Sequence, residues 1–197
     1  MFLNIFLNGR VYNSAEWSVA RKIIDETFEC SRNDGGSDLD GTDEGVSVEF
    51  TLSEERLHGV DAMRNFDSYL HVAVNRCTEY GALKWLVTPG SAVPVESATA
   101  EHVWISDNPA PPENDPRVIS DPDLQRYHHV RSTLPIAAVR AALEEFCRTG
   151  TGVRPSAIDW TPGDLSGRRH DAPDPKSSVA YCDDPWCEIS EPGHPCH

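Results

Sequence analysis

Apolar residues between Ser132 and Trp160 recur first with the period of a helix. They stand every three or four positions, at Ile136, Val139, Leu143 and Phe146. This spacing predicts an amphipathic helix with one buried stripe. Pro135 favours the first helical turn, and Gly150 favours the left-handed conformation that ends many helices. We therefore expect a helix between Pro135 and Thr149.

The residues after this helix have the pattern of a short strand. Val153, Ile158 and Trp160 are apolar, and Pro155 would place the strand at a sheet edge or delay its start. An apolar stripe on a helix must be buried against a partner, and the large apolar runs upstream are strand-like. The pattern therefore predicts a helix packed on a sheet.

Four upstream segments are short and rich in Val, Phe, Tyr, Trp and Leu, which is typical of strands. They are residues 46–52, 69–75, 82–88 and 102–106. Residues 1–12 alternate around Asn8 and Gly9, a turn-forming pair that predicts a strand or small hairpin. The short connection between the second and third segments favours antiparallel neighbours. We expect an α+β fold, with an antiparallel β-sheet of about five to six strands packed by two main helices.

The second of these helices should follow the first strand. Its apolar positions have helical spacing, at Trp17, Ala20, Ile24 and Phe28. Asn13 could cap its N-terminus, with Glu16 as the reciprocal partner of a capping box. We expect this helix to end near Cys30.

Length and composition predict one domain and a tail. The chain has 197 residues, which suits a single core, but 15 prolines and a hydrophobic content of 39% indicate that part of it is loop. We expect residues 1–162 to form one α+β domain. Residues 163–197 are predicted to be an acidic, disordered or loosely docked tail that contains Pro, Cys and His.

The charge balance restricts the possible partners. The formal net charge is −15, from 32 acidic and 17 basic residues. Direct nucleic-acid binding is disfavoured, because phosphate contacts require clustered Lys and Arg. The acidity either keeps the surface soluble through self-repulsion or faces a basic partner.

Two segments concentrate acidic residues in predicted loops. Residues 31–45 are rich in Gly and charge, and residues 108–123 contain closely spaced prolines that predict an exposed loop. The candidate partner-binding carboxylates are Asp38, Asp40, Asp43, Glu44, Asp107, Glu113 and Asp115.

No apolar run has the length of a membrane span, and the first seven residues lack the features of a signal peptide. We expect a cytoplasmic protein with no membrane partner. Cys30, Cys77 and Cys147 are isolated along the chain and should be single reduced residues. The neighbouring pair His128 and His129 is expected to face solvent or cap a turn.

Catalytic motifs are absent from the sequence. We find no nucleophile elbow, no phosphate-binding glycine loop and no zinc-protease or zinc-deaminase signature, which argues against an enzyme. A hydrolase would still require a deep pocket with convergent His and carboxylate groups. We expect no cofactor.

One alternative function rests on the tail. Its thiols and imidazoles could form a tetrahedral zinc site from Cys182, Cys187, His194 and Cys196. The C-x4-C spacing and the position at the chain terminus disfavour that site. The alternative reading is a small zinc-binding regulatory or interaction module.

A group of residues carries a family resemblance. They include Trp85, Pro135, Phe146, Gly150, Arg154, Pro155 and Trp160. In this pattern, over about residues 1–162, the chain resembles the immunity protein one family of bacterial polymorphic toxin systems. The resemblance implies an α+β protein that binds and silences a toxin inside the producing cell, most often a nucleic-acid deaminase, including ones that act on cytosine in DNA.

The motif residues themselves are expected to be structural. Trp160 should pack beneath the C-terminal helix, and Arg154 should pair with a carboxylate or a C-terminal carbonyl. The resemblance and the charge together suggest an acidic protein that occupies the cationic substrate entrance of its toxin.

Overall fold

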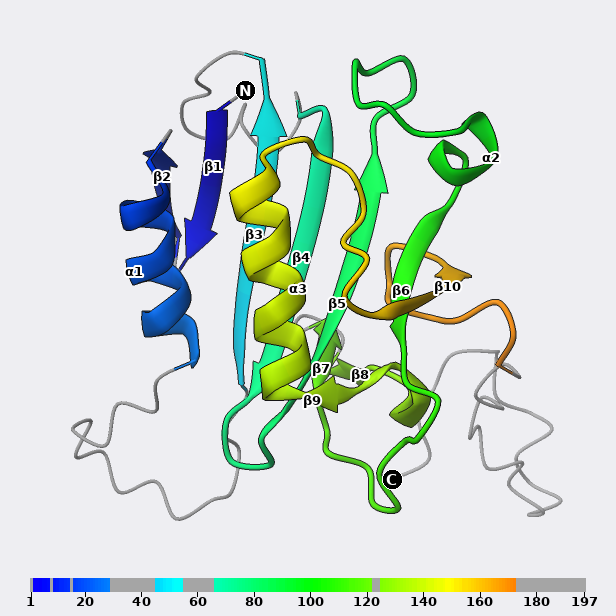
Figure 1. Ribbon diagram of the computed structural model, residues 1–197. Coiled ribbons are helices and arrows are strands. Elements are labelled where there is room, and N and C mark those ends of the chain that lie inside the picture. Colours follow the sequence, from blue (N-terminus) through cyan, green and yellow to red (C-terminus); the bar gives the residue numbers. More distant parts are fainter. Residues whose placement is uncertain are drawn as a thin grey trace, which may run out of the picture.

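The structure is a computed structural model that describes residues 2–7, 9–14, 16–28, 45–54, 66–121 and 125–172. Its centre is an antiparallel sheet of eight described strands (Figure 1). In spatial order these are β10 (Asp159–Gly163), β6 (Val103–Asp107), β5 (Tyr80–Val87), β4 (Ser68–Asn75), β3 (Val46–Ser53), β1 (Phe2–Leu7) and β2 (Arg10–Ser14), with β9 (Leu134–Pro135) paired to β5. A separate two-stranded ribbon is formed by β7 (Ile119–Asp121) and β8 (Arg126–Tyr127).

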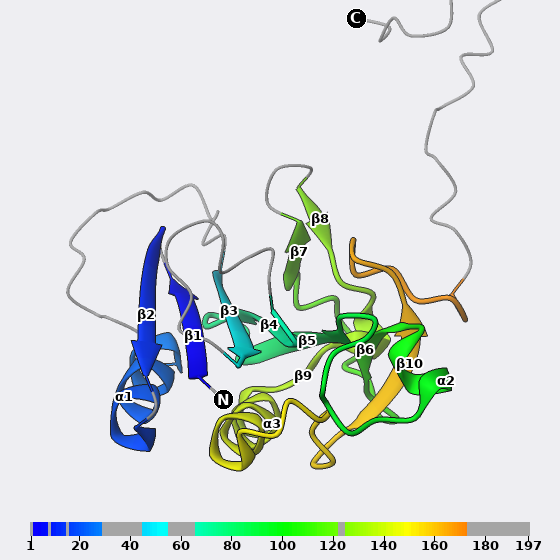
Figure 2. The same cartoon turned by 90° about the horizontal axis from the view of Figure 1, so that it is seen from above.

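The helices confirm the predicted α+β class. α1 (Trp17–Phe28) and α3 (Ile136–Thr149) cover one face of the sheet, and the short α2 (Ser97–Ala100) precedes β6. Figure 2 shows both long helices on one side of the sheet and the β7–β8 ribbon on the other. Within the described residues, no helix is long and apolar enough to cross a membrane.

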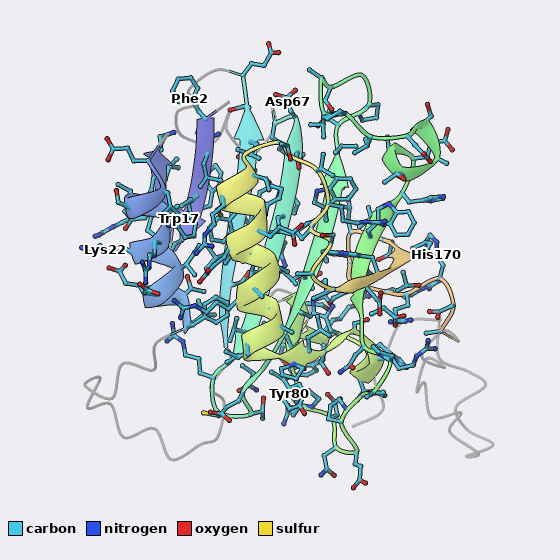
Figure 3. The ribbon with its side chains drawn as sticks, viewed as in Figure 1. Phe2, Trp17, Lys22, Asp67, Tyr80 and His170 are labelled. Carbon is cyan, nitrogen blue, oxygen red and sulfur yellow. The ribbon has the colours of Figure 1, made fainter. Side chains whose placement is uncertain are left out.

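The core lies between the sheet and the two long helices. Strand side chains alternate in direction, so every second residue of the central strands points at the helices. The fully buried ones include Val48, Phe50, Leu70, Val72, Leu83 and Trp85, and they meet Ala20, Ile23 and Ile24 of α1 and Val139, Leu143 and Phe146 of α3. Figure 3 draws the side chains on the ribbon and labels Trp17 of α1, whose ring centroid lies 4.7 Å from the guanidinium carbon of Arg148 on α3.

Helix α3 confirms the predicted apolar stripe and both of its ends. Pro135 directly precedes the first helical residue, where its missing N–H costs nothing. Gly150 has a φ of 57° and donates its backbone N–H to the Phe146 carbonyl. The left-handed conformation at Gly150 explains why the helix stops there.

Helix α1 is present, but the predicted cap at Asn13 is wrong. Asn13 lies in β2 opposite Asn4, and its Nδ2 donates to the Asn4 Oδ1 at 2.8 Å. The helix begins at Trp17 and the Glu16 carbonyl accepts its first backbone hydrogen bonds, so Glu16 and not Asn13 occupies the cap position. At the other end, Arg76 from the β4–β5 turn donates to the Thr27 carbonyl at 2.8 Å and caps α1 from a distance.

Two segments predicted to be exposed are partly buried. Residues 108–123 are not a loop throughout, because they contain β7, and Val118 packs against Ala73 and Ala82 on the sheet face that lacks helices. The chain also stays on the sheet beyond the expected domain end at residue 162. Residues 163–172 fold back, and Gly163 forms a bridge with the fully buried Arg169.

Candidate functional site

The acidic loop between β6 and β7 is fixed at both ends. At its start, the Asn108 N–H donates to the Arg131 carbonyl and its Nδ2 donates to the Thr133 carbonyl, both at 2.7 Å. At its far end, the Pro116 carbonyl accepts a hydrogen bond of 2.9 Å from Asn75 Nδ2. Figure 1 shows this loop extending beyond the end of β6. The loop is therefore held in one place relative to the sheet.

Two of the predicted carboxylates, Glu113 and Asp115, are exposed on this loop. The Asp115 Oδ1 accepts the Arg117 N–H at 2.8 Å, which closes a tight turn. Arg117 in turn donates to the Tyr127 hydroxyl at 2.8 Å and lies 4.9 Å from the centroid of that ring. The loop thus presents two carboxylates on an ordered frame.

Asp107 has a different environment from those two residues. Its carboxylate lies 2.7 Å from the Arg169 guanidinium, whose side chain is 0% exposed, and 3.9 Å from Arg131. Arg169 also holds Asp171, and its hydrogen bonds lower the pKa of the Asp171 carboxyl to about 2. Asp107 therefore helps to hold residues 163–172 on the sheet, a role that the sequence pattern did not indicate.

The remaining sequence candidates cannot be placed. Asp38, Asp40, Asp43 and Glu44 lie outside the described residues, as do Cys182, Cys187, His194 and Cys196. Across the ranges that the structure describes, no group of three or more His, Cys, Asp or Glu side chains could hold a metal ion.

Four of the motif residues meet in one cluster at β5, β6 and β10. The Arg154 guanidinium lies over the Trp104 ring, 3.9 Å from its centroid, and about equally far from two further indoles, at 5.9 Å from Trp85 and 6.0 Å from Trp160. Trp85 is fully buried, whereas Trp104, Trp160 and Arg154 are half-buried. Pro155 joins the cluster through its carbonyl, which accepts the Trp160 indole N–H at 2.8 Å.

Backbone groups fix each indole of this cluster. Besides the Trp160 bond, Trp85 donates to the Gly152 carbonyl at 3.1 Å and Trp104 donates to the Thr99 carbonyl at 2.8 Å. A ring whose N–H is bonded in this way cannot rotate freely, so the surfaces that border Arg154 keep their positions.

Arg154 itself contradicts the predicted pairing with a carboxylate or a carbonyl. Among the described residues it makes no hydrogen bond or ion pair, and its Nη1 is buried without a partner. Burial lowers the pKa of Arg154. The carboxylate near it in sequence, Glu145, instead accepts the Ser156 and Ala157 N–H groups at 2.8 and 2.9 Å, and so ties the Arg154 loop to α3. Cation–π contact replaces charge pairing at this position.

Trp160 was expected beneath the C-terminal helix. It lies on the edge strand β10, where it pairs in register with Ser106. Trp104 is missing from the sequence candidates, although it completes the cluster. The pairing of Trp85 opposite Trp104 brings the two indoles together. The sequence of each strand alone does not indicate this register, because register depends on how the two strands pair.

A polar row crosses the opposite face of the sheet. Glu49, His71 and Lys84 stand directly opposite one another on β3, β4 and β5. Lys84 is buried and its Nζ donates to the Ser120 carbonyl at 3.2 Å and the Leu165 carbonyl at 3.0 Å. Burial lowers the pKa of Lys84 and of His71. The Lys84 ammonium thus fastens two covering segments to the sheet.

The two neighbouring histidines, His128 and His129, have different environments. His129 confirms the capping role, because its Nδ1 accepts the Arg131 N–H at 3.2 Å at the start of a 3-10 turn. His128 was expected at the surface, but it is only 1% exposed and lies under Gly167. Burial, followed by the nearby Lys84 charge, lowers the pKa of His128 to about 3. The ribbon that carries it covers the sheet, which the sequence did not predict.

The comparisons with known proteins give one match. No curated protein and no solved structure is significantly similar to the chain. The family model of immunity protein Imm1 matches residues 36–162, a span that includes β3 to β10 and the whole Arg154 cluster. Because this match covers more than half of the sequence, the chain belongs to the Imm1 family of immunity proteins, which serve in toxin systems and have a cognate toxin as their partner.

Proposed function

We propose that this immunity protein neutralises a nucleic-acid deaminase, one that acts on cytosine, by covering its cationic substrate entrance. The protein performs no reaction of its own and acts in the cytoplasm of the cell that makes the toxin. It has no cofactor in this role, and it contacts neither nucleic acid nor membrane.

The physical support begins with charge. A deaminase must admit a polyanionic strand and draw a base into its pocket, so the approach to that pocket is lined with cations. A protein with a net charge of −15 is attracted to such a surface and repelled by the nucleic acid that competes for it. This attraction supports the proposed inhibition by occupation of the entrance.

The observation that carries the proposal is the anchored acidic loop. Glu113 and Asp115 are exposed between two ends that are bonded to the rest of the fold at Asn108 and Pro116. A loop that is already ordered loses little conformational entropy when it docks. The loop can therefore bring both carboxylates against the basic residues around the substrate entrance of the toxin without rearranging.

The test uses the toxin encoded beside this gene, which the proposal expects to carry a deaminase domain. Cells that express both proteins should survive, and cytosine deamination of a single-stranded DNA substrate should stop at an equimolar ratio of the purified proteins. Inhibition should weaken as salt rises. The toxin should regain full activity, with unchanged mass, after the complex is dissociated, since the proposal involves no modification.

Two outcomes would contradict the proposal. One is a saturated complex of the two proteins that still binds and deaminates DNA. The other is substoichiometric inhibition that leaves a covalently altered toxin, because this would mean that the immunity protein is an enzyme.

A further inference from the structure

Arg154 has hydrogen-bonding capacity that the described part of the fold does not use. A guanidinium carries five N–H donors. Arg148 provides a contrast, since it also lies over an indole, 4.7 Å from the Trp17 centroid, but donates to the Glu144 carboxylate at 3.0 Å. Arg154 has three indoles around it and no acceptor among the described residues. An unsatisfied polar group that is held this firmly calls for an explanation outside the fold.

Part of the Arg154 guanidinium reaches solvent. Nη1 is buried and unpartnered, whereas Nε and Nη2, which make no bond within the described part of the chain, keep some solvent-exposed surface, and Arg154 as a whole is half-buried. Trp104 and Trp160 are likewise half-buried rather than enclosed. The cluster therefore presents one polar edge between two aromatic surfaces.

We propose that this edge is an anchor point for a carboxylate side chain of the toxin, with Trp104 and Trp160 packing against the same segment. The inference rests on the proposed function, because it concerns the same partner. A carboxylate matches the planar fork of a guanidinium with two parallel hydrogen bonds. A Lys or Arg of the toxin would be repelled here, and an apolar group would leave the Arg154 donors without water or acceptor.

The composition and rigidity of the cluster suit such an anchor. Trp and Arg are among the residues most enriched at the positions that dominate binding energy, and they act there in pockets from which water is excluded. The bonds from the three indoles to the Gly152, Thr99 and Pro155 carbonyls already fix the rings. Binding therefore requires little further ordering at this position.

The sign of the charge gives the anchor a second role. The acidic loop and the overall charge attract any cationic surface, but they do not determine the orientation of the toxin in the complex. Because the Arg154 guanidinium is positive and binds an acidic residue in preference to others, it would fix the orientation in which the toxin docks. Trp104 and Asp107 both belong to β6, so this contact and the acidic loop are joined by one short strand.

The experiment measures the affinity of the adjacent-gene toxin for full-length variants by calorimetry. Arg154→Gln removes the charge and the fork, and Arg154→Lys keeps the charge only. We expect Arg154→Gln to weaken binding about tenfold or more, and Arg154→Lys to lie between it and the wild type. The matched control is Arg148→Gln, which removes another arginine stacked on a tryptophan and should change affinity less than about twofold.

Folding is checked by thermal unfolding and by the near-ultraviolet circular dichroism of the tryptophans. If the Arg154 variants do not fold, the toxin is varied instead, with each exposed carboxylate replaced by its amide. One such change should weaken binding to the wild-type immunity protein. The inference is overturned if folded Arg154→Gln binds as tightly as the wild type, or if no single toxin carboxylate matters. Failure of the wild type to bind the toxin at all would instead refute the proposed function.

Discussion

The Asp107 carboxylate and the Arg169 guanidinium lie 2.7 Å apart and join the end of β6 to the segment that follows β10. Arg169 has no exposed side-chain surface. Its Nε and Nη2 donate to the Asp171 carboxylate at 2.8 and 2.9 Å, and its Nη1 donates to the Arg131 carbonyl at 3.2 Å while forming the ion pair with Asp107. The segment 163–172 is therefore part of the folded body, and its attachment depends on charge in a buried setting.

Replacement of Arg169 should destabilise the protein. Arg169→Gln leaves the Asp107 carboxylate without its main counter-charge, and breaking a buried pair of this kind costs about 3–5 kcal/mol of unfolding free energy. Chemical denaturation measures the loss, and limited proteolysis should show earlier cleavage within residues 163–172. Glu113→Gln, a change to an exposed carboxylate, serves as the control and should leave stability within about 0.5 kcal/mol of the wild type. Equal stability of Arg169→Gln and wild type would mean that the pair contributes nothing.

Changes in the acidic loop should act on association with the toxin rather than on folding. Glu113→Lys combined with Asp115→Asn removes two negative charges and adds a positive one, while the amide oxygen introduced at position 115 can still accept the Arg117 N–H. We expect slower association and a weaker dependence of the rate on salt, because steering comes from charge. Stopped-flow mixing gives both quantities.

The control for the loop is Glu26→Lys, a charge reversal of an exposed residue on α1, away from the loop. If Glu26→Lys affects association as strongly as the loop double variant, only net charge matters. In that case the loop would have no special place in the complex.

Acid should weaken the fold through His128. Burial keeps the pKa of His128 at about 3, below the ordinary value of 6.5. The unfolded chain binds this proton below pH 6.5 and the native state does not, so the unfolding free energy falls as pH drops from about 6.5 towards 3. One such group contributes a slope of up to about 1.4 kcal/mol per pH unit.

Denaturation at a series of pH values checks this slope. His128→Gln should reduce it, although some slope should remain because burial also lowers the pKa of His71. The control is His102→Gln, at an exposed histidine before β6. A slope that is the same in wild type and His128→Gln would show that His128 does not account for the acid sensitivity.

Gly150→Ala should cost about 1 kcal/mol of unfolding free energy. Gly150 has a φ of 57°, a backbone conformation that is strained for residues with a Cβ atom. Beyond its immediate chain neighbours, no atom of the described residues lies within 4 Å of an added Cβ, so the cost is conformational and does not come from a clash. Gly150→Asn should cost less, because Asn tolerates the left-handed region better. Thermal unfolding measures both, and an equal loss in the two variants would point to another cause.

Local patterns determined much of the fold. The apolar period of residues 136–146, the glycine at 150 and the alternating runs of the central strands each depend on near neighbours in the chain. The helices and main strands therefore appear close to their predicted positions, and the α+β class follows from them. Trp85, Arg154 and Trp160 also belong to the sequence pattern that carries the family resemblance.

Local patterns failed where a distant partner decided the outcome. Asn13 has the chemistry of a helix cap, but the register of the hairpin places it opposite Asn4, and its side chain donates a hydrogen bond to the Asn4 side chain. His128 and Arg169 are polar, yet the β7–β8 ribbon and the segment after β10 bury both of them against the sheet. Those covering segments are short and rich in turns, so no periodicity indicated them.

The sequence alone determined the acidic charge, the helices, the strands and the family of this protein, because these depend on composition and on neighbours within a few residues. Only the tertiary structure decided what Arg154 contacts, since the three indoles around it come from strands whose pairing brings distant parts of the chain together. That the Arg154 guanidinium has no carboxylate partner among the described residues emerges only from the positions of its neighbours in the folded chain.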